Sequence, residues 1–421
     1  MAGGVALALS GIDTQAGADL GLPSIYPALP EPATSGIEHI VVVMMENRSF
    51  DHFLGWMPNA NGKQSGLSYE DRYGTLYDTY HLSAFNNCGF NDPDHSYEGG
   101  RIEFNGGACD GWLKAGLNDV SAIGYYQQAD LAFLGQAAPQ WTTFDHYFAP
   151  VMAETYPNRF YMHAAQTDRL HNSTAQATIP TIWDSLAAAG VKGTYFFNDV
   201  PFTALWYTKY LNISQPYAAF KALAAAGQLP AVSFIDPRFE DEGSGTSNDD
   251  HPHADIRAGE TFLNDVYESI TNSPNWPNTV LVITFDEWGG FFDHIAPGSA
   301  PDVSPKTALR GFRVPTVVIS PFARRRHVGH NTYDHTSILK MIEWRFGLPS
   351  LTPRDANARN LAEALDLSAP NLSAPQYTVP TFVTTGCEAG ASVSTTLQGA
   401  EFNEWGDLKK LATTLGWVLP A

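Results

Sequence analysis

Residues 37–55 read IEHIVVVMMENRSFDHFLG. Within this stretch, residues 40–45 (IVVVMM) are apolar at every position, which is typical of a strand that is buried on both faces. Three polar side chains, Glu46, Asn47 and Arg48, follow the strand directly. Charged side chains are seldom buried unless they are paired. The abrupt change therefore predicts that the strand delivers Glu46 and Asn47 to a functional position.

The rest of the chain alternates strand patterns with helix patterns. Further strands are predicted at residues 193–197, 231–235, 279–285 and 314–320, and helices at residues 181–189, 260–270 and 337–346. Such alternation predicts an α/β fold with a central, mostly parallel sheet flanked by helices. The segments 279–285 and 314–320 are apolar on both faces, so they are predicted to be central parallel strands.

The 421 residues divide into three predicted regions. Residues 1–36 form an N-terminal extension, and residues 37–350 form the main domain. Residues 351–421 are rich in Pro, Ser and Thr and are predicted to be a peripheral C-terminal extension packed on or beside the core. Long loops rich in Gly, Asn, Asp and Pro, at 86–111 and 236–258, are predicted to be functional because loops of that length seldom persist without a role.

Composition excludes several classes of protein. The chain has 44 acidic and 24 basic residues, a formal net charge of −20, which disfavours nucleic acid as a partner, although solubility alone also explains an acidic surface. It has no run of the roughly 20 apolar residues that a transmembrane helix needs. An apolar patch at residues 5–9 has no basic residues before it, so it is at most the remnant of a signal peptide. We expect a secreted or periplasmic protein.

Three cysteines, Cys88, Cys109 and Cys387, allow at most one disulfide within the chain. Cys88 and Cys109 bracket a loop rich in Gly and Asn that a bridge would restrain, whereas Cys387 lies in a different region. The sequence therefore favours a bridge between Cys88 and Cys109.

Side chains with carboxylate or amide oxygens directly follow two of the predicted strands. Asp286 and Glu287 follow the strand at 279–285, as Glu46 and Asn47 follow the first strand. If these strands are parallel neighbours, their terminal oxygens meet at one edge of the sheet, where the repulsion between carboxylates requires a cation. Oxygen ligands favour Ca²⁺ or Mg²⁺, with Zn²⁺ or Mn²⁺ as alternatives. The competing interpretation is that each carboxylate is a solvated strand end or a helix cap.

Loop histidines and one threonine extend this pattern. The histidines are His95 in DPDHSY, His251 and His253 in NDDHPH, His294 in FFDH and His335 in YDHTS. Thr155 lies before Pro157 in AETYPNRFYMH, at the start of a helix-like segment. A hydroxyl at a helix N-terminus can be activated as a nucleophile, but it can equally be a simple N-terminal cap, which this motif alone favours.

Over roughly residues 37–350 the chain resembles the phosphoesterase family of bacterial phospholipases C, plant non-specific phospholipases C and related acid phosphatases. The segments that carry the resemblance occur in the family's order: VVVMMENRSFDHFLGWM, AETYPNR, SNDDHPHADIRAGETFLNDVYESI, LVITFDEWGGFFDHIAPG, and RGFRVPTVVISPF with YDHTSILKMIEWRFGL. The resemblance implies an alkaline-phosphatase-like sandwich around a central sheet. Sulfatases share the wider fold, but their Cys or Ser followed by x-Pro-x-Arg is absent from this sequence.

The resemblance also implies roles for particular residues. The metal ligands are Glu46, Asn47, Asp286 and Glu287, joined by the nucleophile Thr155. A threonine at this position is typical of the phospholipase C branch, whereas the acid phosphatases carry serine. His95, His251 with Asp250, and more weakly His294 and His335 would surround the phosphoryl group. The sequence reads Ala-Glu-Thr where the family usually has Gly-Pro-Thr, which places Glu154 beside the nucleophile.

The expected activity is that of a phospholipase C, which cleaves the glycerol-side phosphodiester of a phosphatidylcholine-like lipid to give diacylglycerol and a phosphorylated headgroup. A metal-activated Thr155 would form a phosphothreonine intermediate. The protein would touch a membrane surface peripherally, without a transmembrane segment. The alternative is an acid phosphatase-type phosphomonoesterase that uses the same site, and a rival of another class is an inactive binding protein with a structural metal.

Overall fold

A computed structural model describes residues 26–239, 244–384, 386–387 and 403–420. The apolar patch at residues 5–9 lies outside the described residues. At the centre is an eight-stranded sheet. Its strands, in spatial order, are β13 (His327–Gly329), β6 (Thr142–Phe144), β12 (Thr316–Ile319), β11 (Thr279–Phe285), β1 (His39–Met45), β10 (Val232–Ile235), β8 (Gly193–Phe197) and β9 (Ser214–Pro216).

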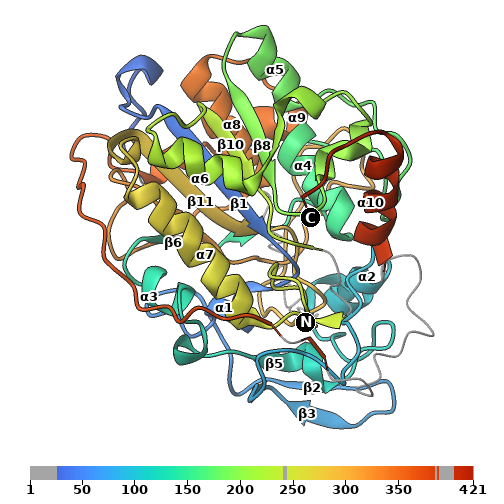
Figure 1. The fold of residues 1–421 in the computed structure, drawn as a ribbon. Helices are drawn as coiled ribbons and strands as arrows, with labels where there is room; N and C mark the ends of the chain where they lie inside the picture. The colour runs from blue at the N-terminus through green and yellow to red at the C-terminus, as the bar shows by residue number, and fades with distance from the viewer. Residues whose placement is uncertain (1–25, 240–243, 385, 388–402, 421) are drawn as a thin grey trace, which may run out of the picture.

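Helices cover both faces of this sheet, as Figure 1 shows, with α6 and α7 side by side in front of it and α8 behind it. The helices are α1 (Phe50–Leu54), α2 (Gly99–Phe104), α3 (Leu134–Ala137), α4 (Thr155–Ala164), α5 (Ile182–Ala188), α6 (Tyr217–Ala225), α7 (Ile256–Thr271), α8 (His335–Phe346), α9 (Pro353–Ala356) and α10 (Glu404–Thr414). Short strand pairs join β2 (Ser68–Glu70) to β3 (Leu76–Asp78), β4 (Tyr80–His81) to β5 (Gly124–Tyr125), and β7 (Tyr147–Phe148) to β14 (Tyr333–Asp334).

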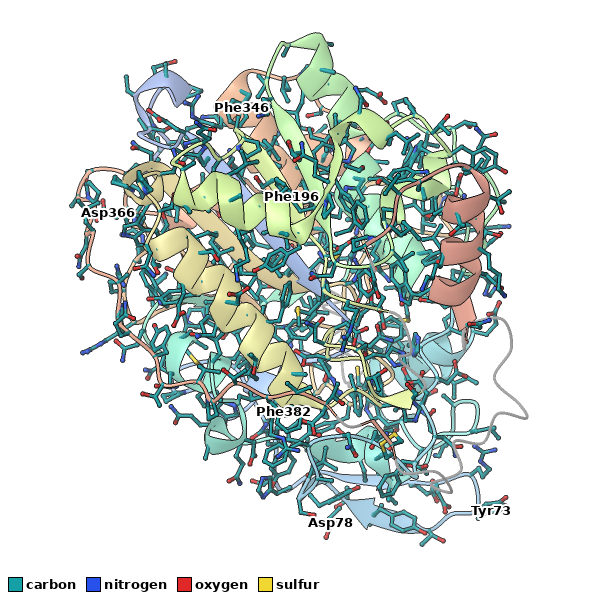
Figure 2. All side chains as sticks on the ribbon, in the orientation of Figure 1. Tyr73, Asp78, Phe196, Phe346, Asp366 and Phe382 are labelled. Atoms are coloured by element: carbon teal, nitrogen blue, oxygen red, sulfur yellow. A yellow bond between two sulfur atoms is a disulfide. The ribbon has the colours of Figure 1, made fainter. Side chains whose placement is uncertain are left out.

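The predicted fold class is confirmed. The strands β11, β1, β10, β8 and β9 run parallel to one another, and each side chain of β11 is buried, as both-face burial of a central strand requires. Side chains fill the space between sheet and helices, and the labelled Phe196 of β8 packs against Phe220 of α6 with ring centroids 5.4 Å apart (Figure 2).

One strand direction was predicted wrongly. β12 is antiparallel to β11, with Leu281 opposite Ile319, rather than a further parallel strand. Parallel neighbours need a crossover connection, usually a helix, whereas the described segment between β11 and β12 contains no helix. Apolar residues on both faces show that a strand is central, but they carry no information about its direction.

The predicted disulfide is also wrong. Cys88 pairs with Cys387, with their Cα atoms 5.5 Å apart, and Cys109 is a buried free thiol. Cys109 lies instead in a small apolar cluster with Trp112 and Phe292, and burial raises the pKa of its thiol to about 12. The bridge therefore ties the loop after residue 86 to the C-terminal region across 299 residues of sequence.

Candidate active site

Three neighbouring parallel strands end at the same edge of the sheet and deliver acidic residues there. Glu46 and Asn47 follow β1, Asp286 and Glu287 follow β11, and Asp236 follows β10. In the register of the sheet Met45 pairs with Phe285, so the two polar pairs emerge side by side. The backbone N–H of Asn47 donates to Asp286 Oδ1 at 3.0 Å. The structure thus brings together the four side chains that the strand-end argument selects.

Thr155 joins this cluster from helix α4. The N-cap of the helix is Glu154, and Thr155 is the first helical residue, so its hydroxyl is not the cap. Thr155 Oγ1 instead donates to Glu46 Oε2 at 3.4 Å, and the side chain is buried. Glu154 turns away from the cluster, because its Oε1 pairs with His171 Nδ1 at 2.7 Å. The positive end of α4 therefore faces the buried carboxylates beside the threonine.

Arg159, which sequence reasoning missed, lies one helical turn after Thr155 and binds three of the strand ends. Its Nη1 donates to Asp236 Oδ1 at 2.9 Å, its Nε donates to Asp286 Oδ2 at 3.2 Å, and its Nη2 donates to Glu46 Oε1. Burial alone would lower the pKa of Arg159, but these carboxylates raise it well above its usual value. The spacing of four residues from Thr155 was a usable signal, since side chains at i and i+4 share one helix face.

Negative charge exceeds positive charge among these strand ends. Arg159 is the cation that pairs with them in the described part of the chain, against four buried carboxylates: Glu46, Asp236, Asp286 and Glu287. Burial raises the pKa of Glu46 and of Glu287 well above the usual range. Two buried oxygens, Asn47 Oδ1 and Glu287 Oε1, have no hydrogen-bond partner among the described residues. Unpaired oxygens within a negatively charged cluster fit a hard divalent cation.

One of the predicted histidines, His95, contacts the cluster, and another, His251, pairs with Asp92. His95 Nδ1 lies 2.8 Å from the carbonyl of Pro93, which as a hydrogen bond makes Nδ1 the donor and leaves Nε2 as an acceptor for the Asn47 amide at 3.3 Å. His251 Nε2 lies 3.3 Å from Asp92 Oδ2. Burial would raise the pKa of Asp92, but His251 and His95 hold it well below the usual range.

Asp250 does not share the direction of its neighbour His251. Its backbone has a φ of 75°, and its carboxylate lies against Gly259 of α7, where an added Cβ would be 2.0 Å from Oδ1. Burial raises the pKa of Asp250 well above the usual range, and the charge of Glu260 raises it further. The carboxyl group therefore faces α7 and Glu260.

We expect Glu260 to make stability depend on pH. Its Oε2 accepts from the backbone N–H groups of Leu134, at 2.8 Å, and Phe133, and burial raises its pKa from 4.5 to about 8. The folded state thus retains a proton that the unfolded state loses. The free energy of unfolding should fall as the pH rises from about 4.5 to about 8, by at most about 1.4 kcal/mol per pH unit.

Urea unfolding at several pH values between 5 and 8 measures this effect. Glu260→Gln retains a side-chain oxygen for the two N–H groups but has no proton to lose, so the variant should show the flatter profile. Parallel profiles for the two proteins would show that Glu260 does not titrate in this range.

His294 belongs to a second cluster with Asp51 and Asp293, whose ligand atoms lie within 4.8 Å of one another and could hold a metal ion. Arg313 already pairs with both of its carboxylates, with Nη2 3.1 Å from Asp51 Oδ1 and Nε 2.9 Å from Asp293 Oδ1. The second oxygen of Asp51 accepts from the His294 backbone N–H at 2.8 Å. These oxygens are satisfied, in contrast to those around Asn47 and Glu287.

Two further histidines lie outside the centre of the cluster. His335 Nε2 lies 2.8 Å from the carbonyl oxygen of Asp286, and His335 Nδ1 lies 3.2 Å from Tyr147 Oη. The ring therefore links the residue that follows β11 to Tyr147 of β7. His253 Nε2 lies 3.2 Å from the carbonyl of Phe90. Both imidazoles are engaged with backbone carbonyls.

Comparison with known proteins assigns the family. The sequence model of the phosphoesterase family matches residues 37–349, about three quarters of the chain. The chain belongs to the phosphoesterase family. Among its relatives, non-specific phospholipase C6 of Arabidopsis thaliana is 32% identical over 390 residues, covering 81% of this chain and 74% of that protein. Phospholipase C B of Mycobacterium tuberculosis is 31% identical, covering 84% of this chain and 83% of that protein.

Solved structures give more distant likenesses to this phosphoesterase. The lipoteichoic acid synthase LtaP of Listeria monocytogenes is 9% identical, covering 94% of this chain and 97% of that chain, with a TM-score of 0.44. A protein in the alkaline phosphatase superfamily from Vibrio parahaemolyticus is 12% identical, covering 77% of this chain and 70% of that chain, with a TM-score of 0.38.

Proposed function

We propose that this phosphoesterase is a phospholipase C that cleaves the glycerol-side phosphodiester of a phosphatidylcholine-like lipid, with Thr155 as its nucleophile. The observation that carries the proposal is the position of the Thr155 hydroxyl, at the first residue of α4 and 3.4 Å from Glu46 Oε2 within the strand-end cluster. Relatives of both bacterial and plant origin are named phospholipases C, which supports the reaction class.

A divalent cation is part of the proposal. Glu46, Asn47, Asp286 and Glu287, with the hydroxyl of Thr155, would hold it, and their oxygen donors favour Ca²⁺ or Mg²⁺, with Zn²⁺ or Mn²⁺ as alternatives. The unpartnered oxygens of Asn47 and Glu287 support this placement. When bound, the cation would supply the positive charge that lowers the pKa of the Thr155 hydroxyl and offsets charge on the phosphoryl oxygens.

The reaction would proceed in two displacements at phosphorus. Glu46 accepts the hydrogen bond of the Thr155 hydroxyl and would thereby fix the direction of its oxygen. Attack would form the Thr155 Oγ1–phosphorus bond and break the bond to the glycerol oxygen, while Glu46 takes the proton of the Thr155 hydroxyl. His251, oriented by Asp92, would protonate that oxygen as diacylglycerol leaves, a role typically worth about 10²- to 10⁴-fold. Water would then attack phosphorus and give a proton to His251, the Thr155 Oγ1–phosphorus bond would break, and Thr155 would regain its proton from Glu46 as the phosphorylated headgroup leaves.

Lipid choice and location are proposed from charge and covalent structure. The net charge of −20 disfavours anionic lipid surfaces, so a zwitterionic headgroup and peripheral contact with a zwitterionic membrane are proposed.

None of the helices in the described part of the chain is long and apolar enough to cross a bilayer. The Cys88–Cys387 bridge is compatible with an oxidising compartment, and we therefore propose a secreted or periplasmic enzyme.

Product analysis tests the proposed function. Vesicles of phosphatidylcholine, incubated with the protein and Mg²⁺, Ca²⁺, Mn²⁺ or Zn²⁺ in turn, should yield diacylglycerol and phosphocholine, while a chromogenic phosphate monoester should be hydrolysed more slowly. Release of phosphatidic acid would place the cleavage on the wrong side of phosphorus. A strong preference for the monoester would favour the phosphomonoesterase instead.

A further inference from the structure

The last described helix, α10, contacts the helix that carries Thr155 although the two are far apart in sequence. Tyr156 Oη donates to the carbonyl of Glu404 at 2.9 Å, and the Tyr156 ring lies 5.5 Å from that of Trp405. Trp405 is 2% exposed and belongs to the main hydrophobic core, along with Leu408 of the same helix. The first turn of α10 therefore touches the residue next to the proposed nucleophile.

Trp405 also forms part of a wall beside Arg159. Its ring stacks on Phe239, with centroids 3.7 Å apart and ring planes at 3° to each other. The Arg159 Cζ lies over both rings, 4.7 Å from the Phe239 centroid and 5.3 Å from the Trp405 centroid. Phe239 follows the end of β10 and is fully buried. The Arg159 guanidinium thus has two aromatic rings as neighbours, while its N–H groups donate to the carboxylates.

This arrangement has a physical consequence for the cluster. A guanidinium is planar and presents its N–H groups in a fixed fork, so the position of Arg159 sets the positions of Glu46 and Asp286 relative to each other. Aromatic rings beside it exclude water, which strengthens its ion pairs. Without Trp405, water could reach Arg159 and the fork could tilt.

We propose that Trp405 is a positioning residue of the active site, which acts through Arg159 to hold Glu46 and Asp286 in their reactive arrangement. The C-terminal helix is then a functional part of the catalytic centre, although it lies outside the segment that matches the phosphoesterase family. This inference rests on the proposed function, since it assigns Trp405 to the site of Thr155.

Trp417 provides a matched control in the same C-terminal segment. It is 6% exposed, its ring lies 6.5 Å from that of Phe197, and its Nε1 donates to the carbonyl of Tyr207 at 3.2 Å. Removal of either tryptophan side chain opens a cavity in the core, so Trp405→Ala and Trp417→Ala should both lower the midpoint of thermal unfolding. A purely structural role for Trp405 would make the two variants equivalent in catalysis.

The experiment measures kcat and KM of the full chain on phosphatidylcholine vesicles for both variants. Trp405→Ala should lower kcat by about 10- to 100-fold at nearly unchanged KM, because a displaced catalytic geometry slows the chemical step. Trp417→Ala should keep kcat within about twofold of the wild type. Trp405→Phe, which preserves a ring on Phe239, should recover most of kcat, whereas Trp405→Leu, which preserves apolar bulk alone and guards against misfolding, should not. Equal kcat in Trp405→Leu and wild type would overturn the proposal.

A second readout separates this inference from the proposed function. Stabilisation of the folded protein by Mn²⁺ reports on Glu46 and Asp286 without requiring turnover. If the wild type hydrolysed no phosphatidylcholine, the proposed function would fail, and the inference would stand on this measurement. A smaller Mn²⁺-dependent rise in unfolding temperature for Trp405→Leu than for Trp417→Ala supports it. Equal rises, or no rise in any variant, would remove it.

Discussion

Thr155→Val is expected to lower kcat by about 10⁴-fold or more, because removal of a nucleophile leaves only the catalysis supplied by binding and charge stabilisation. Valine matches threonine in shape, so the packing at the start of α4 is retained. The hydroxyl makes one described hydrogen bond, to Glu46 at 3.4 Å, and its loss should change stability by only about 1 kcal/mol. Steady-state hydrolysis of phosphatidylcholine measures the loss.

Thr155→Ser is the control for this experiment. Serine keeps the attacking oxygen at the same backbone position and loses only a methyl group, so the variant should retain turnover well above that of Thr155→Val. A Thr155→Val enzyme with more than a tenth of wild-type kcat would show that the oxygen attacking phosphorus comes from elsewhere.

Arg159→Met is expected to be the most damaging substitution for stability. It leaves Glu46, Asp236 and Asp286 buried without their shared cation, and removal of one partner from a buried ion pair costs about 3–5 kcal/mol. Arg159→Lys should rescue only part of the loss, because an ammonium group cannot reproduce the planar fork that reaches three carboxylates. Urea unfolding and kcat, measured together, test both effects.

Arg169→Met is the matched control for this substitution. Arg169 pairs with Asp168 and lies over the ring of Phe160, at 4.4 Å from its centroid, so it resembles Arg159 in having an ion pair and an aromatic neighbour. Its partner Asp168 is 26% exposed, and the pair should contribute about 1 kcal/mol or less. Similar losses for the two methionine variants would contradict the central role given to Arg159.

The sheet was predictable where the sequence pattern is local. The apolar runs that form β1 and β11 are uninterrupted. The polar residues that directly follow them must therefore lie at the edge of the sheet where these strands end. The direction of β12 was not predictable, because it depends on the path of the long segment after residue 286 rather than on the strand's own residues. Central position is encoded in side chains, whereas direction is encoded in connections.

The candidate site divides in the same way. Asp236 follows the β10 strand as Asp286 follows β11, so the strand-end rule could have found it, and the helical spacing from Thr155 could have found Arg159. Asp250 and His251 are adjacent in sequence, but the positive φ of Asp250 sends their side chains to different places. Trp405 reaches Arg159 only through the packing of α10, a long-range contact with no local signature.

The most direct test of the central claim is a crystal structure of the protein grown with Mn²⁺, with anomalous diffraction used to locate the ion. The account predicts an anomalous peak within bonding distance of Asn47 Oδ1 and Glu287 Oε1, the two strand-end oxygens of the proposed ligand set that lack a hydrogen-bond partner among the described residues. A peak confined to the Asp51–Asp293–His294 group, or no peak beside Thr155 at saturating Mn²⁺, would contradict it.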